Sequence, residues 1–110
     1  MSTISTHVLD TALGKPAAGV PVTLERATDD MVLGSGATDT DGRLRDLMPQ
    51  DRALSEGIYR LRFDVAQYFT DTKRDALYPE IVIVFRVTRD EHYHIPLLLS
   101  PFGYSTYRGS

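Results

Sequence analysis

The sequence predicts an all-β sandwich, and three observations lead to that fold class. Most of the 110 residues fall into short segments in which apolar and polar residues alternate, which is typical of strands with one buried face. Turn-forming residues, mainly Gly, Pro, Asp and Ser, separate these segments. Helical periodicity is scarce. Because a chain of this length holds one core, we expect a single domain over residues 1–110, with two sheets packed face to face.

Three strands are expected in the first third of the chain. Residues 3–9 alternate, so that Ile4, Thr6 and Val8 share one face while His7 lies on the other with Thr3, Ser5 and Leu9. A Gly-Lys-Pro turn at 14–16 ends this strand. A second strand is predicted over 20–25 and a third over 31–38.

The centre of the chain combines a tight turn, an irregular stretch and another strand. Residues 39–43 form a turn by residue type, because Asp bonds its own backbone and Gly allows a positive φ. This turn places Arg43 directly after a bend. Residues 47–56, which include Pro49, are expected to be irregular. Residues 58–65 then alternate cleanly, which predicts a strand whose odd-numbered residues face inward.

One short helix is expected between Ala66 and Leu77, where the alternation breaks. Tyr68, Phe69 and Thr72 stand there at spacings of three and four residues, which suits one face of a helix. The Tyr-Pro pair at 78–79 is expected to end the helix, because Pro cannot continue it.

The last third of the chain contributes the remaining strands. Residues 80–87 form the most β-branched run and have apolar residues on both faces, which predicts a strand that is central or lies at an interface. A strand over 91–99 contains Pro96, which is allowed only at an edge or a bulge. Residues 104–107 form a last short strand, so the total is about seven, as in a small sandwich.

Composition restricts the possible partners. The net charge of −3 and the pI near 5.5 argue against nucleic acid, because proteins that bind it carry a concentrated basic surface. There are no cysteines, which excludes disulfides, thiolate metal sites and a Cys nucleophile. The first residues lack the basic and apolar regions of a secretory signal, and no segment approaches the ~20 apolar residues of a membrane span. We therefore expect a cytoplasmic protein with no membrane partner.

The three histidines are the first candidates for chemistry, because only His titrates near neutral pH without help. His92 and His94 are two residues apart in a predicted strand, so they project from the same face. Such a pair can bind a metal ion or share proton transfer, and it is also common as a solvated or interface pair. His7 alone has no signature spacing. Arg43 can clamp an anion or a carbonyl group with its planar donors, or simply face solvent.

Other motifs are either absent or incomplete. The two aspartates of the 39–43 turn resemble the start of a calcium loop, but Arg43 stands where the third oxygen ligand is required, so we reject calcium. There is no Gly-x-Ser-x-Gly motif and no Gly-rich phosphate loop. Phe102, Tyr104 and Tyr107 place aromatic side chains almost at the last residue, whereas most termini are small and polar. We therefore expect a docked C-terminal tail.

Six blocks of the sequence together resemble a known family. They are His7–Asp10, Gly14–Ala17, Thr40–Arg43, Tyr78–Ile81, His92–Ser100 and Tyr104–Ser110. In this order and at this spacing they resemble the transthyretin-like 5-hydroxyisourate hydrolases, over essentially the whole chain, and the terminal Tyr-Arg-Gly-Ser is typical of the enzymes among them. The resemblance implies two four-stranded sheets with one short helix. It also implies a homotetramer, a dimer of dimers with its active sites at the dimer–dimer interface.

The resemblance further implies a reaction and a set of site residues. The reaction is the hydrolysis of 5-hydroxyisourate in urate breakdown, which gives 2-oxo-4-hydroxy-4-carboxy-5-ureidoimidazoline without a metal or other cofactor. By position, His7, Arg43 and His94 match the family's catalytic residues, and Ser110 matches the last residue of its terminal motif. We expect His7 and His94 to orient and deprotonate water, and Arg43 to bind the substrate's polar edge. Tyr107 and Ser110 are expected to close the pocket over the substrate.

Two alternatives stay open. A non-catalytic carrier of small ligands, like transthyretin, has the same fold, although that branch lacks the Tyr-Arg-Gly-Ser end and has Lys where this chain has His7. A zinc hydrolase would use His7, His92 and His94 as three ligands and keep an open fourth position. The resemblance speaks against zinc, and it gives His92 a secondary role.

Overall fold

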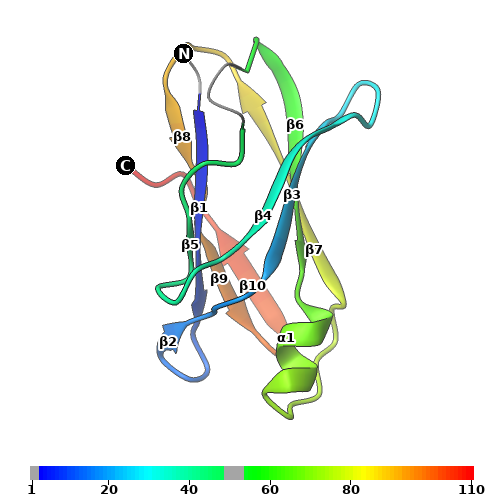
Figure 1. The fold of residues 1–110 in the computed structure, drawn as a ribbon, viewed down its shortest axis with the longest axis vertical. Coiled ribbons are helices and arrows are strands. Elements are labelled where there is room, and N and C mark those ends of the chain that lie inside the picture. Colours follow the sequence, from blue (N-terminus) through cyan, green and yellow to red (C-terminus); the bar gives the residue numbers. More distant parts are fainter. Residues whose placement is uncertain (1–2, 49–53) are drawn as a thin grey trace.

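Two β-sheets pack face to face in the computed structural model, which describes residues 3–48 and 54–110, and one short helix lies at one end of the sandwich (Figure 1). The all-β sandwich with a single helix is thus confirmed for this part of the chain. Pro49, in the stretch expected to be irregular, lies outside the described residues. No helix in residues 3–48 or 54–110 has the length and apolar content to cross a membrane.

The alternating segments form the long strands, and shorter elements lie between them. The elements in chain order are β1 (Thr3–Asp10), β2 (Lys15–Pro16), β3 (Pro21–Arg26), β4 (Val32–Ala37), β5 (Arg43–Leu44), β6 (Gly57–Asp64), α1 (Ala66–Asp71), β7 (Glu80–Val87), β8 (His92–His94), β9 (Leu97–Ser100) and β10 (Gly103–Thr106). The sequence did not predict β2 and β5, because two residues are too few to show alternation. It predicted β8 and β9 as one strand, and Pro96 lies at the break between them.

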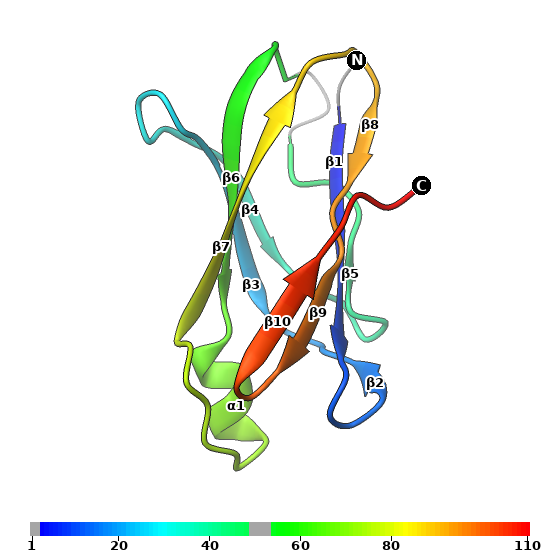
Figure 2. The same cartoon turned by 180° about the vertical axis from the view of Figure 1, so that it is seen from behind.

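The two sheets are built around β6 and β1. One sheet is antiparallel, with the order β4-β3-β6-β7. In the other, β1 pairs in parallel with β8 and β9, and antiparallel with β2 and β5, while β10 pairs with β9 (Figure 2). This second sheet has six strands rather than the four expected. The reason is that β8 and β9 follow each other along β1, and so do β5 and β2, so the sheet path β10-β9-β1-β2 is still four strands wide.

The core lies between the two sheets and is formed by one face of each long strand. In β1, Ile4 and Val8 are buried, as are Leu61 and Phe63 in β6. Each such side chain contributes about 1.5–3 kcal/mol when it is fully buried. With these residues held inward, the alternate residues of β1, including Ser5 and His7, are placed on the outer face of its sheet. This outer face carries the candidate site.

Strand β7 and helix α1 differ from their predictions in position and length. The run 80–87 was expected to be central or at an interface, but within this chain β7 is an edge strand, and Val84 on its outward face is 61% exposed. The central placement is therefore wrong, because the second apolar face covers nothing in the chain. Helix α1 ends at Asp71, before the Tyr-Pro pair expected to stop it, since Lys73 adopts a left-handed φ of 58°.

A buried carboxylate joins β1 to the segment around α1. Asp10 is fully buried and accepts hydrogen bonds from the Tyr68 hydroxyl at 2.7 Å and from Arg74 Nη2 at 2.5 Å. The backbone N–H of Leu13 donates a third, at 3.0 Å. Burial alone would raise the pKa of Asp10, but these hydrogen bonds outweigh it and lower the pKa from its ordinary value of 3.8. Burial and the same carboxylate raise the pKa of Tyr68 to about 12.

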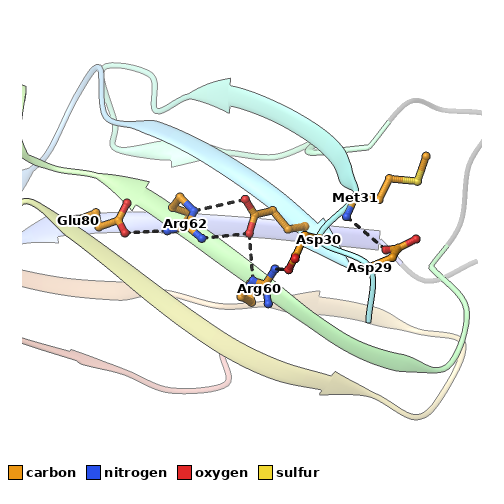
Figure 3. A network of polar contacts seen from close by, with 7 residues as sticks. Asp29, Asp30, Met31, Arg60, Arg62 and Glu80 are labelled. Atoms are coloured by element: carbon orange, nitrogen blue, oxygen red, sulfur yellow. Dashed lines mark hydrogen bonds and ion pairs between the residues drawn. The ribbon is translucent and has the colours of Figure 1, made fainter. Parts of the chain in front are cut away.

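The outer face of the antiparallel sheet carries a row of charges rather than a pocket (Figure 3). Arg60 pairs with Glu25 at 3.0 Å and with Asp30, and Arg62 pairs with Glu80 at 2.7 Å and also reaches Glu25. The pairs at the exposed ends of the row each contribute about 0–1 kcal/mol, whereas the Glu25 and Arg60 side chains between them are largely buried. The row therefore gives this face a charged surface.

Candidate active site

The parallel pairing of β1 with β8 brings two histidines and two hydroxyls together. In this register Thr3 stands opposite His92, and Ser5 stands opposite His94. Ser5 Oγ lies 2.8 Å from His92 Nε2 and 2.8 Å from His94 Nδ1, while Thr3 Oγ1 lies 2.5 Å from His92 Nδ1. The two histidines thus project from the same face, as their spacing predicts. The hydroxyls of Thr3 and Ser5 were not predicted to belong to the site. They meet the histidines through the register of two strands, which a local sequence pattern does not contain.

The turn before β5 holds Arg43 in place through its backbone. Gly42 has a φ of +75°, and its N–H donates to the Asp39 carbonyl at 2.9 Å. Asp39 Oδ1 accepts from the backbone N–H groups of Asp41 at 2.9 Å and Arg43 at 3.0 Å. These bonds, with the one from Arg43 the largest cause, lower the pKa of Asp39. The Asp carboxylate therefore fixes a bend, as expected from the residue types, and that bend delivers Arg43 to β5.

His7 lies next to this turn with one ring nitrogen already committed. It stands opposite Arg43 across the β1–β5 pair, and its Nε2 is 2.8 Å from the Asp41 carbonyl oxygen. A carbonyl oxygen only accepts, so Nε2 of His7 carries a proton and donates it. In neutral His7, Nδ1 is then the nitrogen with a free lone pair.

A hollow of about 300 Å³ opens on this face of the sheet, and its lining contains most of the predicted site. Its walls are Ser5, Thr6, Arg43, Arg45, His92, His94 and Ser110. Arg45 was missed by the sequence reasoning, although its spacing of two from Arg43 was a usable signal for a shared face. The structure brings Arg43, His94 and Ser110 together here. His7 does not line this hollow, but it is close enough for its charge to act on His94.

The C-terminal tail is docked, and it reaches the hollow through Gly109 and Ser110. Gly109 forms a bridge with His94, donating its N–H to the His94 carbonyl at 2.8 Å. Arg108 pairs with Glu91 at 2.9 Å and lies over the ring of Tyr93, with 4.5 Å from Cζ to the ring centroid. The expected docking is thus confirmed.

Tyr107, in contrast, is 56% exposed and lines a different hollow, which it shares with β7 residues. Within one chain, Tyr107 therefore does not reach the hollow that contains His94. Its expected role in closing the pocket stays a prediction.

The electrostatics of the hollow favour a neutral His94. Burial lowers the pKa of His94 from its ordinary value of 6.5, and the nearby cationic or protonatable side chains of His92, His7 and Arg43 lower it further. Its Nδ1 faces Ser5, and its Nε2 makes no hydrogen bond to another described residue. A neutral imidazole beside two arginines is suited to take a proton from water, while the arginines offset negative charge on a reacting oxygen.

The zinc alternative requires three ligands that converge on one point. Among residues 3–48 and 54–110, no group of three His, Cys, Asp or Glu side chains is placed to share a metal ion. The ring nitrogens of His92 bond to Thr3 and Ser5, and Nε2 of His7 bonds to Asp41. The described geometry therefore gives a zinc mechanism no ligand set.

Comparison with known proteins places the chain in one family. Residues 4–109 match the model of the HIUase/Transthyretin family. The 5-hydroxyisourate hydrolase of Salmonella typhimurium is 49% identical over 110 residues, which cover 97% of this chain and 80% of that protein. The 5-hydroxyisourate hydrolase of Caulobacter vibrioides is 44% identical over 117 residues and the match covers both chains fully.

Solved structures agree on the fold. The 5-hydroxyisourate hydrolase of Klebsiella pneumoniae superposes with a TM-score of 0.89 at 36% identity, over 100% of this chain and 94% of that one. Sea bream transthyretin in complex with thyroxine superposes with a TM-score of 0.88 at 28% identity, over 97% of this chain and 94% of that one. An enzyme and a carrier thus share this backbone about equally. The chain therefore belongs to the HIUase/transthyretin family.

Proposed function

We propose that this chain hydrolyses 5-hydroxyisourate in urate degradation, and that the hollow between β1, β5 and β8 is its active site. The relatives of the chain and the geometry of the hollow both support this proposal. Relatives up to 49% identical over nearly the whole chain are 5-hydroxyisourate hydrolases. The single observation that carries the chemistry is that His94, whose pKa is lowered by burial and by nearby charge, shares one hollow with Arg43 and Arg45.

His94 is the general base in this proposal. Water attacks the carbonyl carbon of the cyclic amide-like bond of 5-hydroxyisourate, and His94 takes the proton that the water loses. The C–N bond then breaks and the leaving nitrogen receives that proton, which leads to 2-oxo-4-hydroxy-4-carboxy-5-ureidoimidazoline. A base has to be unprotonated before it acts, and its efficiency is highest when its pKa lies near the working pH. Burial and nearby positive charge lower the pKa of His94 below 6.5, so at pH 7 most molecules hold His94 in its neutral form.

The two arginines bind the substrate and stabilise the charge that develops on it. As water attacks, negative charge grows on the carbonyl oxygen, and a guanidinium can donate two parallel hydrogen bonds to such oxygens. Neither Arg43 nor Arg45 forms an ion pair with another described residue, so both are available to a ligand. Arg43 is the better fixed of the two, because its backbone N–H is bonded to Asp39.

His7 and Ser110 complete the site in supporting roles. Since Nε2 of His7 donates to Asp41, Nδ1 is the atom that orients water or substrate. His7 does not line the hollow with His94, so we assign the base to His94 rather than to His7. Ser110 lines the hollow beside His94 and contributes a polar wall.

The active unit in this proposal is a homotetramer, with sites at the interface between dimers. Two features support it. The hollow lies on an outer sheet face, so that within the described chain nothing covers it. The edge strands β7 and β10 each have one backbone edge without a partner strand in the chain, and exposed apolar side chains, Val84 and Tyr104, lie on them. Tyr107 closes the pocket only if a neighbouring subunit supplies it. The cytoplasmic location stays a prediction.

A carrier function is the alternative, because sea bream transthyretin in complex with thyroxine has nearly the same backbone. The lining of the hollow argues against it. Two arginines, two histidines and three hydroxyl-bearing side chains surround the space, whereas pockets for apolar ligands are lined mainly by hydrophobic and aromatic residues. A thyroxine-binding measurement separates the two functions directly, and we expect no specific binding.

The decisive experiment generates 5-hydroxyisourate from urate with urate oxidase and follows its ultraviolet absorbance with and without this protein. We expect acceleration over the spontaneous decay, and activity that survives exhaustive chelation. The single variants His7→Ala, Arg43→Ala and His94→Ala should lower turnover, His94→Ala by about 100- to 10,000-fold, with unchanged circular dichroism. Arg26→Ala is the control, because Arg26 is a partly exposed arginine of the other sheet that pairs with Asp29. A wild-type rate equal to the spontaneous decay would refute the proposal.

A further inference from the structure

A row of four polar side chains leads into the active-site hollow. It runs from Thr3 through His92 and Ser5 to His94, with heavy-atom distances of 2.5, 2.8 and 2.8 Å. Ser5 is 8% exposed, whereas His92 at the outer part of the row is exposed. The reaction proposed above uses His94 alone from this row, so the arrangement of the other three calls for a separate explanation.

Two arrangements of protons place the Ser5 proton within the row. Ser5 carries one proton and stands between two ring nitrogens, so in each of these arrangements it donates to one ring and accepts from the other. In the first arrangement, Ser5 donates to His92 Nε2 and accepts from Nδ1–H of His94. In the second, Ser5 donates to His94 Nδ1 and accepts from Nε2–H of His92. Each neutral histidine has one N–H, so each arrangement fixes the tautomer of both rings.

Only the first arrangement allows His94 to act as a base. With its proton on Nδ1, neutral His94 has a free lone pair on Nε2, the nitrogen without a hydrogen bond to another described residue. After Nε2 takes a proton, Nδ1–H still donates to Ser5, so no bond in the row has to break. In the second arrangement the Nε2 of His94 already carries a proton, and the ring cannot accept another at that atom.

His92 decides between the two arrangements through its own protonation. A neutral His92 with its proton on Nδ1 donates to Thr3 Oγ1 and accepts the Ser5 proton at Nε2. A cationic His92 has protons on both nitrogens and accepts none, so Ser5 can no longer donate to it, and His94 Nδ1 is the one acceptor left in the row for the Ser5 proton. The other charged groups near His94 are His7 from β1, Arg43 from β5 and Arg45. The hydrogen bond at Nδ1 of His94 comes from Ser5 rather than from any of these.

We propose that Ser5 and His92 are positioning residues, which hold His94 with its proton on Nδ1 and leave Nε2 free to take the proton of the attacking water. Neutral His92 favours this tautomer, because it accepts the Ser5 proton, and cationic His92 removes that acceptor. The inference depends on the proposed function for the reaction in which His94 acts, but the tautomer itself is a property of the resting protein.

The tautomer can be measured without any substrate. In ¹⁵N-labelled protein, two-bond and three-bond ring couplings identify which nitrogen of each histidine is protonated, and the chain has three histidines to assign. In the wild type with both rings neutral, we expect His94 to carry its proton on Nδ1. In His92→Phe the acceptor for the Ser5 proton is lost, so the proton of His94 should move to Nε2. Ser35→Ala, an exposed strand serine in the other sheet, should change nothing.

Kinetics provide the second measurement. His92→Phe and Ser5→Ala should each lower kcat by about tenfold or more with a much smaller change in KM, and Ser5→Thr, which keeps the hydroxyl, should restore most of the rate. A wild-type His94 protonated on Nε2, or an unchanged tautomer in His92→Phe, would overturn the inference. Wild-type protein without hydrolase activity but with the expected tautomers would instead contradict the proposed function and leave this inference standing.

Discussion

At the scale of single residues, the pKa of His94 connects the structure to a measurable rate. The base is active when neutral, so kcat/KM should fall as the pH drops through the pKa of His94 in the free enzyme. Burial, His92, His7 and Arg43 lower this pKa from 6.5. We therefore expect the acid limb of the pH profile to have its midpoint below pH 6.5.

The variant Arg43→Gln removes one of the positive charges, so the pKa of His94 should rise toward 6.5 and its titration should move to higher pH. Titration of the His94 ring by NMR checks this shift even if catalysis is weak. Arg26→Gln in the other sheet serves as the charge-matched control. A wild-type midpoint above pH 6.5 would contradict the electrostatic argument.

The buried Asp10 carboxylate leads to a second prediction at this scale. Asp10→Asn removes the charge that pairs with Arg74, and breaking a largely buried pair should lower the free energy of unfolding by about 2–4 kcal/mol at pH 7. The pKa of Asp10 is lower in the folded protein than its ordinary 3.8. The stabilisation is therefore present above pH 3.8 and is lost as the pH falls through the lowered folded value.

Urea denaturation of both proteins at pH 7 and near pH 3, at one fixed concentration, measures the effect. The difference between wild type and Asp10→Asn should be smaller at the lower pH. Asp64→Asn, at the exposed end of β6, should stay within about 0.5 kcal/mol of the wild type at pH 7. An equal difference at both pH values would show that the Asp10 charge has no role.

The site residues differ in how far the sequence predicts their position. His92 and His94 share a face because strand side chains alternate, and Arg43 follows a bend because Asp and Gly favour one. Both features are local. Ser5 meets His94 across 89 positions in the chain, and only the parallel register of β1 and β8 brings them together. A pattern in one segment contains no information on its register with a distant segment. The contacts of Ser5 with His92 and His94 could therefore be found only from the structure.

At the scale of elements, the turn before β5 decides whether Arg43 reaches the hollow. Gly42 has a φ of +75°, and a Cβ added there would lie 2.4 Å from the Val8 carbonyl oxygen. Gly42→Ala therefore combines an unfavourable backbone angle with a backbone clash. We expect it to lower the free energy of unfolding by more than about 1 kcal/mol and to lower kcat/KM, because Arg43 directly follows.

Gly14→Ala is the matched control for this turn. Gly14 also has a positive φ, of 68°, but a Cβ there would meet nothing within 4 Å. We expect a cost of about 1 kcal/mol with kcat/KM retained. Thermal unfolding and the absorbance assay, applied to both variants, separate backbone strain in general from displacement of Arg43. Full activity in Gly42→Ala would show that the turn does not position the arginine.

The elements themselves were predictable where their pattern is long. The alternation of residues 3–9 and 58–65 predicted β1 and β6, since a period of two over several residues has one physical explanation. Strands β2 and β5, of two residues each, show no period. The order of strands was also beyond the local pattern, as β7 shows. Its β-branched run predicted a strand that is central or lies at an interface, and among the described residues it lies at an edge with Val84 exposed, which excludes only the central position.

At the scale of the whole molecule, the exposed apolar face of β7 is best explained by association with other copies of the chain. A long edge strand with apolar side chains favours pairing with another chain unless charges or bulges prevent it. The hollow next to β7, which Tyr107 also lines, has a largely apolar lining. The tetramer of our proposal would cover this region and would also enclose the site on the other sheet.

The variant Val84→Lys tests this assembly, because it places a charge on the exposed face of β7. We expect a smaller species in sedimentation velocity and a lower specific activity, since a site at an interface loses its enclosing subunit. Val32→Lys is the matched control: Val32 is 57% exposed, close to the 61% of Val84, but lies on β4 at the opposite edge of the same sheet.

Dilution of the wild-type protein should have the same effect as Val84→Lys: both the activity per chain and the sedimentation coefficient should fall. A wild-type protein that sediments as a monomer with full activity would show that one chain contains the complete site, and that Tyr107 takes no part in it.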